Sequence, residues 1–529
     1  MCSITNATNF ERLKHSRLTV IAFIFTCLLL AIARPLGAQA GFGDDRVMLQ
    51  GFYYESYRYG HPEKFPDKGD KVWYEVVRSQ AAAMANANFD LVWLPPPSYA
   101  GPVSVGYNPK QYFRLDNSYG SLKQHRAALV ALLQNGLEPV ADIVVNHRDG
   151  TNGWADFQNP AWGTWAICAD DEAFRNSASG IANTPMAQRG VCEEHVAYRP
   201  GTTYAYDAFR DIAHTDVRVR RDIVRYLLQL QSLGYRGWRY DMVHGYGAQW
   251  IAVYNGATKP TFSVGEYDWD KQGEQRGWVW NTASASGETG AEHLKSASDV
   301  FDFETQFSLK AINSSDYTKL YGFGNGIGLV GDTTDGLPWR ERSVTFAENH
   351  DTGYRTKEDG TPEPGHESDS FANNWQVEQA YAFLLTHPGV PCVYWKHYFE
   401  WGQDLQNKIR ALINARKVAG VNSGSATFLQ DNARQAGVYA ARVVGTHGDL
   451  YIRVGGDDDQ WQPSASGYTD YREYAEGAGW KVWVKLPGNP AVVTASHHAP
   501  FPAPQYRSAN RLKVPFEGAA LHSARSAAM

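Results

Sequence analysis

The sequence predicts an α/β protein whose core is a (β/α)8 TIM barrel. An irregular domain is inserted after the third strand, and an antiparallel β domain follows the barrel. The main observation is that eight short apolar runs alternate with helical patterns along most of the chain. Strands that alternate with helices are joined in parallel by crossovers, and eight such units fit a closed barrel. An open doubly wound sheet is the competing arrangement.

The eight predicted strands are rich in β-branched and aromatic residues, and the run 143–145 is apolar without interruption, which indicates burial on both faces. In chain order the strands span residues 47–54, 89–95, 137–147, 235–241, 261–266, 299–303, 342–351 and 389–398. The clearest helical patterns between them span residues 72–87, 121–135, 217–233, 374–385 and 405–418.

Two regions break this alternation. Residues 148–210 are rich in Gly, Asn, Asp and Trp and lack a helical period, so we expect an inserted domain or a lid. Residues 421–488 contain short strands separated by turns, at 437–443, 449–454 and 480–485, and are predicted to form the antiparallel domain. The barrel is therefore assigned to residues 41–147 and 211–420. The tail 489–529 has no predicted role.

The first forty residues have the pattern of a secretory signal peptide. The basic residues Arg12, Lys14 and Arg17 precede an apolar run at 18–33, and small residues follow up to Ala40. The apolar run has 16 residues, which is short for the alternative, a membrane anchor. We therefore expect a secreted, extracellular protein that is cleaved after Ala40 and has no membrane segment in its mature form.

Cysteine usage agrees with export. Cys168 and Cys192 lie in the irregular insertion and could close a disulfide loop in an oxidising compartment. Cys392 lies in an apolar run and is predicted to be a buried free thiol.

The composition is that of a globular protein, with 529 residues, of which 43% are hydrophobic and 20% charged. It excludes disordered and collagen-like chains. The formal net charge of −6 argues against a nucleic-acid partner, because phosphate-binding domains carry a basic excess. The 17 Trp, 30 Tyr and 23 Phe suit either a large core or a sugar-binding cleft.

Polar residues stand at the ends of several predicted strands. Asp241 ends the fourth strand, Glu266 the fifth, and His350 with Asp351 the seventh. In a (β/α)8 barrel these ends meet at one mouth, where catalysis occurs. Three carboxylates that face one another disfavour packing, but they suit hydrolysis of a glycosidic bond, which uses a nucleophile, an acid and an electrostatic stabiliser.

Clustered acids also serve Mg²⁺-assisted chemistry, which is the competing interpretation. Arg239 lies two residues before Asp241 and on the same face of the strand. A fixed cation there keeps Asp241 ionised and weakens a divalent-metal site, so it favours the glycosidic interpretation.

Four ordered segments carry a specific resemblance. They span residues 142–147, 237–241, 264–266 and 346–351, and each ends a predicted strand. They resemble the four motifs of the α-amylase family of glycoside hydrolases. Further segments resemble the plant-like and maltotetraose-forming branch of secreted α-amylases, at 47–52, 92–96, 106–109, 167–171, 349–353 and 389–401. The likeness covers roughly residues 45–488.

The resemblance implies a role for each matching residue. Asp241 matches the nucleophile, Glu266 the general acid/base and Asp351 the transition-state stabiliser. The residues that match sugar-contacting or positioning groups are Arg239, His147, His350 and Tyr107, of which Tyr107 matches an aromatic platform. His244 stands where Lys or Arg is usual, on the leaving-group side, and this departure leaves the product pattern open.

The resemblance also implies a Ca²⁺ ion that joins the insertion to the barrel. Asn146 and Asp211 match its ligands, with the backbone carbonyl of Gly245 as a third. Asp171 and Asp207 are candidates for the remaining ligands. Such a set of hard oxygen atoms is what Ca²⁺ prefers.

The sequence therefore predicts a secreted α-amylase that hydrolyses internal α-1,4-glucosidic bonds with retention. Its expected partners are starch and α-glucan oligosaccharides, and we expect a monomer. A maltotetraose-forming exo-amylase and a glucan transglycosylase would use the same site and stay open as alternatives. A non-catalytic glucan-binding protein on a retained barrel is a further alternative, but such proteins usually lose the acids, and all three are present.

Overall fold

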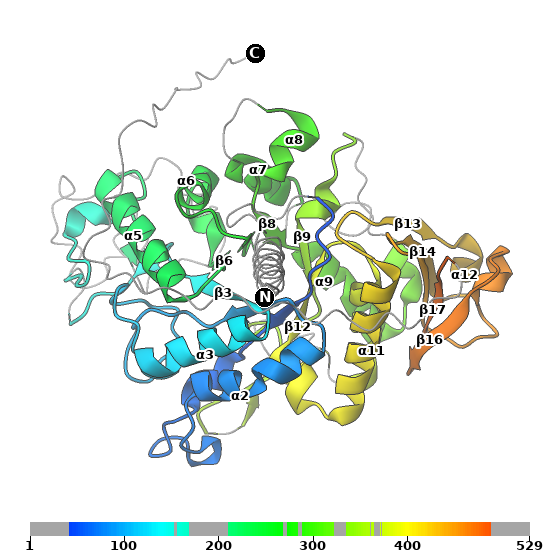
Figure 1. The fold of residues 1–529 in the computed structure, drawn as a ribbon, viewed down its shortest axis with the longest axis horizontal. Coiled ribbons are helices and arrows are strands. Elements are labelled where there is room, and N and C mark those ends of the chain that lie inside the picture. Colours follow the sequence, from blue (N-terminus) through cyan, green and yellow to red (C-terminus); the bar gives the residue numbers. More distant parts are fainter. Residues whose placement is uncertain are drawn as a thin grey trace, which may run out of the picture.

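The computed structural model describes residues 42–152, 156–168, 210–267, 272–283, 288–321, 335–359, 361–363, 371 and 373–487. Its centre is a closed barrel of eight parallel strands in the order β1-β12-β9-β8-β7-β6-β3-β2 (Figure 1). The strands are β1 (Met48–Gln50), β2 (Leu91–Leu94), β3 (Glu138–Ile143), β6 (Gly237–Tyr240), β7 (Phe262–Gly265), β8 (Asp299–Phe301), β9 (Ser343–Phe346) and β12 (Val390–Tyr394). Each lies within one of the eight predicted runs, so the predicted barrel is confirmed.

The ring closes between the first and last strands. Met48 on β1 pairs with Leu91 on β2 and with Cys392 on β12. All residues of the eight strands are buried, because side chains fill the barrel interior and helices cover its outside. The third predicted run was too long: β3 ends at Ile143, and His147 belongs instead to the short strand β4 (His147–Arg148).

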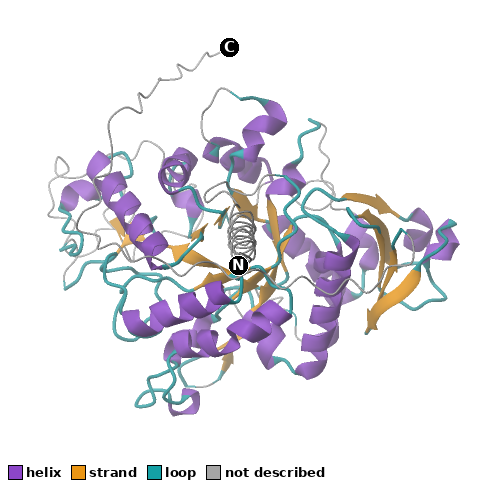
Figure 2. Cartoon of the chain, in the orientation of Figure 1, coloured by secondary structure: helices purple, strands orange, loops and turns teal. Residues whose placement is uncertain are grey.

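Helices surround the strands (Figure 2). They are α2 (Trp73–Asn86), α3 (Leu122–Gln134), α5 (Val217–Leu233), α6 (Ala248–Thr258), α7 (Gln272–Thr282), α8 (Gly290–Lys295), α9 (Phe303–Leu309), α10 (Asn374–Thr386) and α11 (Gln403–Ala419). The five predicted helices are confirmed, and all except α2 have a capping signal at one end or both. Asp216, for example, accepts a hydrogen bond from Arg218 N at 2.8 Å at the start of α5, and Gly234 ends that helix. Helices α6 to α9 were not predicted; the longest, α6 and α7, have only 11 residues each.

Short helical turns complete the connections. Those of the 3-10 type are η1 (Tyr54–Arg58), η2 (Pro66–Lys68), η3 (Thr164–Ala166), η5 (Val243–Gly245), η6 (Lys310–Ser314), η7 (Tyr317–Tyr321), η8 (Trp339–Arg342) and η10 (Pro463–Ser466). The segment η9 (Lys396–Glu400), which follows β12, is a π-helix. Strands β10 (Arg355–Thr356) and β11 (Pro362–Glu363) pair within the loop after β9.

The C-terminal domain is a five-stranded antiparallel sheet in the order β13-β14-β15-β17-β16. The strands are β13 (Ala426–Leu429), β14 (Tyr439–Val444), β15 (Asp449–Val454), β16 (Arg472–Gly477) and β17 (Trp480–Lys485), with α12 (Asp431–Gln435) after β13. The sheet packs against α10 and α11 (Figure 1). Glu378 of α10 fixes this contact by accepting hydrogen bonds from Ala478 N at 3.0 Å and Trp480 Nε1 at 3.2 Å. The predicted antiparallel domain is confirmed, although its half-exposed edge strands β13 and β16 were missed.

The insertion begins and ends at one place. Strand β4 pairs antiparallel with β5 (Arg210–Asp211), with His147 opposite Asp211. Cys168 is disulfide-bonded, and Cys392 is free and buried, as predicted. Among the described residues, no helix is long and apolar enough to span a membrane.

Several predictions fall outside the described residues. These are the signal peptide at 1–40, the tail 489–529, the insertion between 169 and 209, and the candidates Asp171, Asp207 and Cys192 within it. They stay predictions.

Candidate active site

The guanidinium of Arg239 is the centre of the site. It lies on β6, its side chain is 1% exposed, and it contacts carboxylates from three neighbouring strands. Nη1 lies 2.8 Å from Asp142 Oδ1 and 2.7 Å from Asp241 Oδ1, and Nη2 lies 2.7 Å from Glu266 Oε1. One cation therefore brings two of the predicted catalytic acids to the same guanidinium, at the carboxyl ends of β6 and β7.

Backbone hydrogen bonds fix where these two acids stand. Asp241 N donates to Ile143 O at 3.0 Å, and Glu266 N donates to Tyr240 O at 2.9 Å, so the ladder continues one residue past each strand. Met242 then turns the chain with a left-handed φ of 47°, and its N–H donates to Glu266 Oε2 at 3.2 Å. Glu266 is thus held at both oxygens, which fixes the direction in which its carboxyl group faces.

Asp142 is a site residue that sequence reasoning missed. It is fully buried on β3, and its Oδ2 accepts hydrogen bonds from Tyr107 Oη at 2.8 Å and Trp93 Nε1 at 3.0 Å. The signal was present, because a carboxylate in an otherwise apolar, two-sided strand is costly to bury without a partner. Asp142 links Arg239 to the loop that carries Tyr107.

The end of β9 supplies the third acid. His350 Nε2 lies 3.1 Å from Asp351 Oδ2, and Gln50 Nε2 contacts the other ring nitrogen of His350 at 2.9 Å. The rings of His350 and Tyr107 are stacked, with centroids 5.1 Å apart and planes 9° apart. Asp351 has a side chain that is 34% exposed, compared with 9% for Asp241 and 12% for Glu266. Of these three acids, Asp351 is therefore the most accessible to solvent.

Burial and charge act against each other in this cluster. Burial raises the pKa of Asp142 and of Asp241 above the ordinary aspartate range, while Arg239 lowers both by favouring the ionised forms. The two carboxyls also repel each other, which raises the pKa of Asp241 further. Burial raises the pKa of the Tyr107 hydroxyl as well, so this group stays protonated and donates to Asp142.

The three described candidates for calcium binding lie together. Asn146 Nδ2 is 3.4 Å from Asp211 Oδ1. Asn146 Oδ1 is buried without a hydrogen-bond partner among the described residues, and a Cβ placed on Gly245 would lie 2.0 Å from it. The oxygen atom therefore faces the Gly245 backbone. An orphaned amide oxygen beside a carboxylate and a glycine backbone fits a hard cation. In the described part of the chain, no group of three or more His, Cys, Asp or Glu side chains is arranged so that it could hold a metal ion by itself.

Two predicted sugar contacts have well-defined surroundings. His147 Nε2 lies 2.7 Å from the carbonyl oxygen of Tyr107, so this nitrogen carries the proton and the imidazole holds the Tyr107 loop. His244 is buried in η5, with its ring edge-on to Tyr267 at a centroid distance of 6.1 Å.

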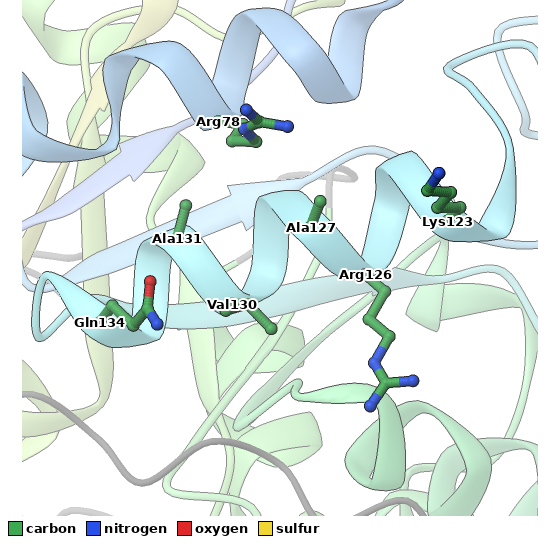
Figure 3. Close-up of a pocket in the computed structure, with 7 residues that line it drawn as sticks. All are labelled: Arg78, Lys123, Arg126, Ala127, Val130, Ala131 and Gln134. Atoms are coloured by element: carbon green, nitrogen blue, oxygen red, sulfur yellow. The ribbon is translucent and has the colours of Figure 1, made fainter.

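A hollow lies on the outer helical layer, between α2 and α3 (Figure 3). Arg78 comes from α2, and the other lining residues come from α3: Lys123, Arg126, Ala127, Val130, Ala131 and Gln134. Its lining residues include no carboxylate and no aromatic ring. It therefore offers no group for acid–base or nucleophilic chemistry at a sugar.

Comparison with known proteins identifies the family. The family described as Alpha-amylase C-terminal beta-sheet domain matches residues 419–484, which cover most of the five-stranded sheet. The chain is 31% identical over 148 residues to an alpha-amylase type B isozyme of Hordeum vulgare, which covers 28% of this chain and 83% of that one. It is 28% identical over 453 residues to a probable alpha-amylase 2 of Arabidopsis thaliana, covering 83% of this chain and 94% of that one.

The chain belongs to the α-amylase family of glycoside hydrolases. Within this family it is also similar to a glucan 1,4-alpha-maltotetraohydrolase of Stutzerimonas stutzeri, with 29% identity over 458 residues that cover 83% of this chain and 74% of that one. The fold is shared with an α-amylase of Geobacillus thermoleovorans solved with acarbose, at a TM-score of 0.57 and 14% identity over 84% of this chain and 99% of that one.

Proposed function

We propose that this glycoside hydrolase cleaves internal α-1,4-glucosidic bonds of starch and related glucans with retention of configuration. The observation that carries the proposal is that one guanidinium contacts both Asp241 and Glu266, at 2.7 Å each. Retaining enzymes need their two carboxyl groups only about 5–5.5 Å apart, so that one can form a bond to the sugar while the other exchanges a proton with the oxygen.

In the first step, ionised Asp241 attacks the anomeric carbon while the carboxyl group of Glu266 gives its proton to the glycosidic oxygen. The bond between that carbon and oxygen breaks, and a covalent glycosyl-enzyme forms. In the second step, the Glu266 carboxylate takes a proton from water, and the resulting hydroxide attacks the same carbon and releases Asp241. Arg239 favours the ionised form of Asp241 before the first step.

Asp351 stabilises the positive charge that develops on the sugar ring. Its half-buried carboxylate stands beside His350, after β9, which is two strands away from β7 in the barrel. Tyr107 offers an aromatic face next to it, which suits stacking against a glucose ring. The imidazoles of His147 and His350 line the sugar site and hold the Tyr107 loop and Asp351 in place. The imidazole of His244 is the candidate hydrogen-bonding group for sugar hydroxyls.

We propose that Asn146, Asp211 and the Gly245 carbonyl hold a Ca²⁺ ion. When bound, the ion supplies positive charge that offsets Asp211 and ties the base of the insertion to the barrel. The catalytic steps use only the side chains above. The candidates Asp171 and Asp207 would complete the oxygen ligands from the insertion.

The leading segment 1–40 supports export to the extracellular space, and we propose a monomer that acts on starch and α-glucan oligosaccharides. Release of maltotetraose from chain ends is the second candidate, because two of the similar relatives carry the name glucan 1,4-alpha-maltotetraohydrolase. Transfer to another glucan passes through the same glycosyl-enzyme.

One incubation tests these proposals. The secreted protein is mixed with soluble starch, its products are resolved by size, and the first anomer released is identified by NMR. A mixture of oligosaccharides with the α-anomer first supports endo hydrolysis with retention. Maltotetraose alone supports the second candidate. Redistribution of chain lengths without new reducing ends means transfer, and release of the β-anomer first contradicts retention.

A further inference from the structure

Two buried carboxylates hold the loop that carries Asp351. This loop joins β9 to α10, and the carboxylates are those of Glu348 and Glu55, whose side chains are 0% and 2% exposed. Neither has a part in the proposed chemistry. Glu348 lies three residues before Asp351, whereas Glu55 comes from the turn after β1.

Glu348 joins the two ends of the loop. Its Oε1 accepts a hydrogen bond from Phe371 N, just before α10, and lies 3.8 Å from Lys310 Nζ. Its Oε2 lies 3.1 Å from His397 Nε2, and the other nitrogen of that imidazole bonds the hydroxyl of Tyr381 at 2.9 Å. A single buried carboxylate therefore fixes the start and the end of the segment that contains Asp351.

Glu55 fixes the middle of the loop. Its Oε1 accepts hydrogen bonds from the backbone N and the hydroxyl of Thr356, and its Oε2 lies 3.0 Å from Lys396 Nζ. The same ammonium donates to the carbonyl oxygen of Tyr354 at 2.8 Å. Arg58 adds hydrogen bonds to the carbonyl oxygens of Thr356 and Lys357, at 2.6 and 3.1 Å.

The contacts of Glu348 and those of Glu55, which we call the two clamps, both reach the same segment. Lys396 and His397 are consecutive residues at the start of η9, a π-helix, and such helices occur frequently at functional sites. Asp351 lies between the clamped positions, and Asn349 Oδ1 accepts hydrogen bonds from the backbone N of Asp351 and of Thr352, both at 2.9 Å. The backbone of Asp351 is thus connected to η9 through hydrogen bonds on both sides of it in the chain.

We propose that Lys396 and His397 are positioning residues for catalysis, which hold the Asp351 carboxylate at the sugar through Glu55 and Glu348. This inference rests on the proposed role of Asp351. It predicts that loss of either clamp lowers kcat, which reports the chemical step, and changes KM for the glucan little.

The first test compares two lysines with the same kinds of partner. Lys396 donates to a carboxylate and to a backbone carbonyl at the mouth, and Lys417 donates to Asp90 Oδ2 at 2.8 Å and Asp45 O at 2.7 Å at the amino ends of the strands. Lys396→Met is expected to lower kcat on soluble starch by about 10- to 100-fold with KM changed less than about threefold. Lys417→Met should keep kcat within about twofold. Equal kcat values for the two variants at matched folded fractions would overturn the proposal.

The second test asks whether Lys396 acts through Asp351. If it does, Lys396→Met combined with Asp351→Asn should lower kcat by no more than about threefold beyond Asp351→Asn alone. If the kcat losses of the two single variants multiply in full, Lys396 does not act through Asp351. That outcome would overturn the positioning role and leave the proposed role of Asp351 intact. An Asp351→Asn variant of normal activity would overturn the proposed role of Asp351 itself, and that outcome is read before Lys396 is changed.

A matched histidine pair extends the test to the other clamp. His397 and His387 are both fully buried, and both ring nitrogens of each are hydrogen-bonded; His387 contacts Phe383 O and Tyr439 Oη, both at 2.7 Å. His397→Gln is expected to reduce kcat as Lys396→Met does, whereas His387→Gln should lower only the melting temperature. A kcat loss in both histidine variants, or in neither, would contradict a specific role for η9.

Discussion

The two ends of the barrel differ in how charge is matched. At the amino ends, a cation contacts one or two buried acids: Arg342 Nη1 lies 2.9 Å from Asp299 Oδ1, and Arg46 contacts Asp44 and Glu138, at 2.7 and 3.3 Å. At the carboxyl ends, the single guanidinium of Arg239 contacts three carboxylates. An excess of acid is unfavourable for packing, and at the carboxyl ends repulsion from Asp142 adds to burial in raising the pKa of Asp241, as acid–base chemistry often requires. The comparison indicates that the amino end is arranged for stability and the carboxyl end for reaction.

The largest expected effect is on turnover at the mouth. Asp241→Asn removes the proposed nucleophile and should lower kcat by about 10⁴-fold or more. The fold should survive, because the amide keeps the volume of the carboxyl group and Arg239 keeps two other acids. Initial rates on soluble starch and a melting curve check both parts. A variant with more than a tenth of normal kcat would contradict the assignment of Asp241.

The matching change at the amino end should alter stability instead. Asp299→Asn removes the carboxylate that pairs with the buried cation of Arg342. Breaking a buried pair costs about 3–5 kcal/mol in the free energy of unfolding, and the loss should be at the low end here because burial raises the pKa of Asp299 to about 7. Urea unfolding measures this loss. The kcat per folded molecule should stay within about twofold, because Asp299 begins β8 at the far end from the acids. A large loss of kcat with unchanged stability would break the comparison.

Calcium removal should have a smaller effect. An ion present at 100 times its dissociation constant stabilises the folded state by about 2.7 kcal/mol, which corresponds to a few degrees in melting temperature. Chelation with EDTA is therefore expected to lower the melting temperature, and excess Ca²⁺ should restore it while Mg²⁺ should not. Asn146→Ala is the matched variant, and EDTA should leave its melting curve unchanged. If EDTA has no effect on the unmodified protein, the proposed site is wrong.

The smallest effect concerns pH. In the proposed mechanism only ionised Asp241 attacks. Burial and repulsion from Asp142 raise its pKa more than Arg239 lowers it, so the acid limb of kcat/KM should lie above the ordinary aspartate range. Asp142→Asn removes that repulsion, lowers the pKa of Asp241 and should move the acid limb to lower pH. The new amide group meets donors on both sides, so kcat should also fall. The shift of the acid limb is expected despite this loss. An acid limb that stays in place or moves upward would contradict this coupling.

The sequence was most informative where residues follow a local period. The runs that became β3 and β12 and the patterns that became α5 and α11 are long and regular, and their hydrophobic residues predict burial directly. Short helices such as α9, with seven residues, offer too few turns for a period to emerge. The edge strand β16 is mostly polar for a strand, because one side of it faces solvent.

The site was predictable where motifs end strands, and not where distant segments meet. Asp241, Glu266 and Asp351 could be selected because each follows a strand. The contact between Glu55 and Lys396 joins positions 341 residues apart, and no local pattern relates the two. Asp142 shows an intermediate case: its position was visible in the sequence, but its partners Trp93 and Tyr107 depend on how the barrel closes.

The pairing of β4 with β5 has a consequence for how this barrel tolerates change. His147 and Arg148 leave the barrel directly opposite Asp211 and Arg210, and Ile167 forms a further bridge with Ile212. The length of the segment 169–209 beyond these pairs can therefore change without shifting the register of β3 or β6. Exchange of that segment between homologues, with 147–168 and 210–212 kept as the joints, would leave the strands of the barrel unaltered.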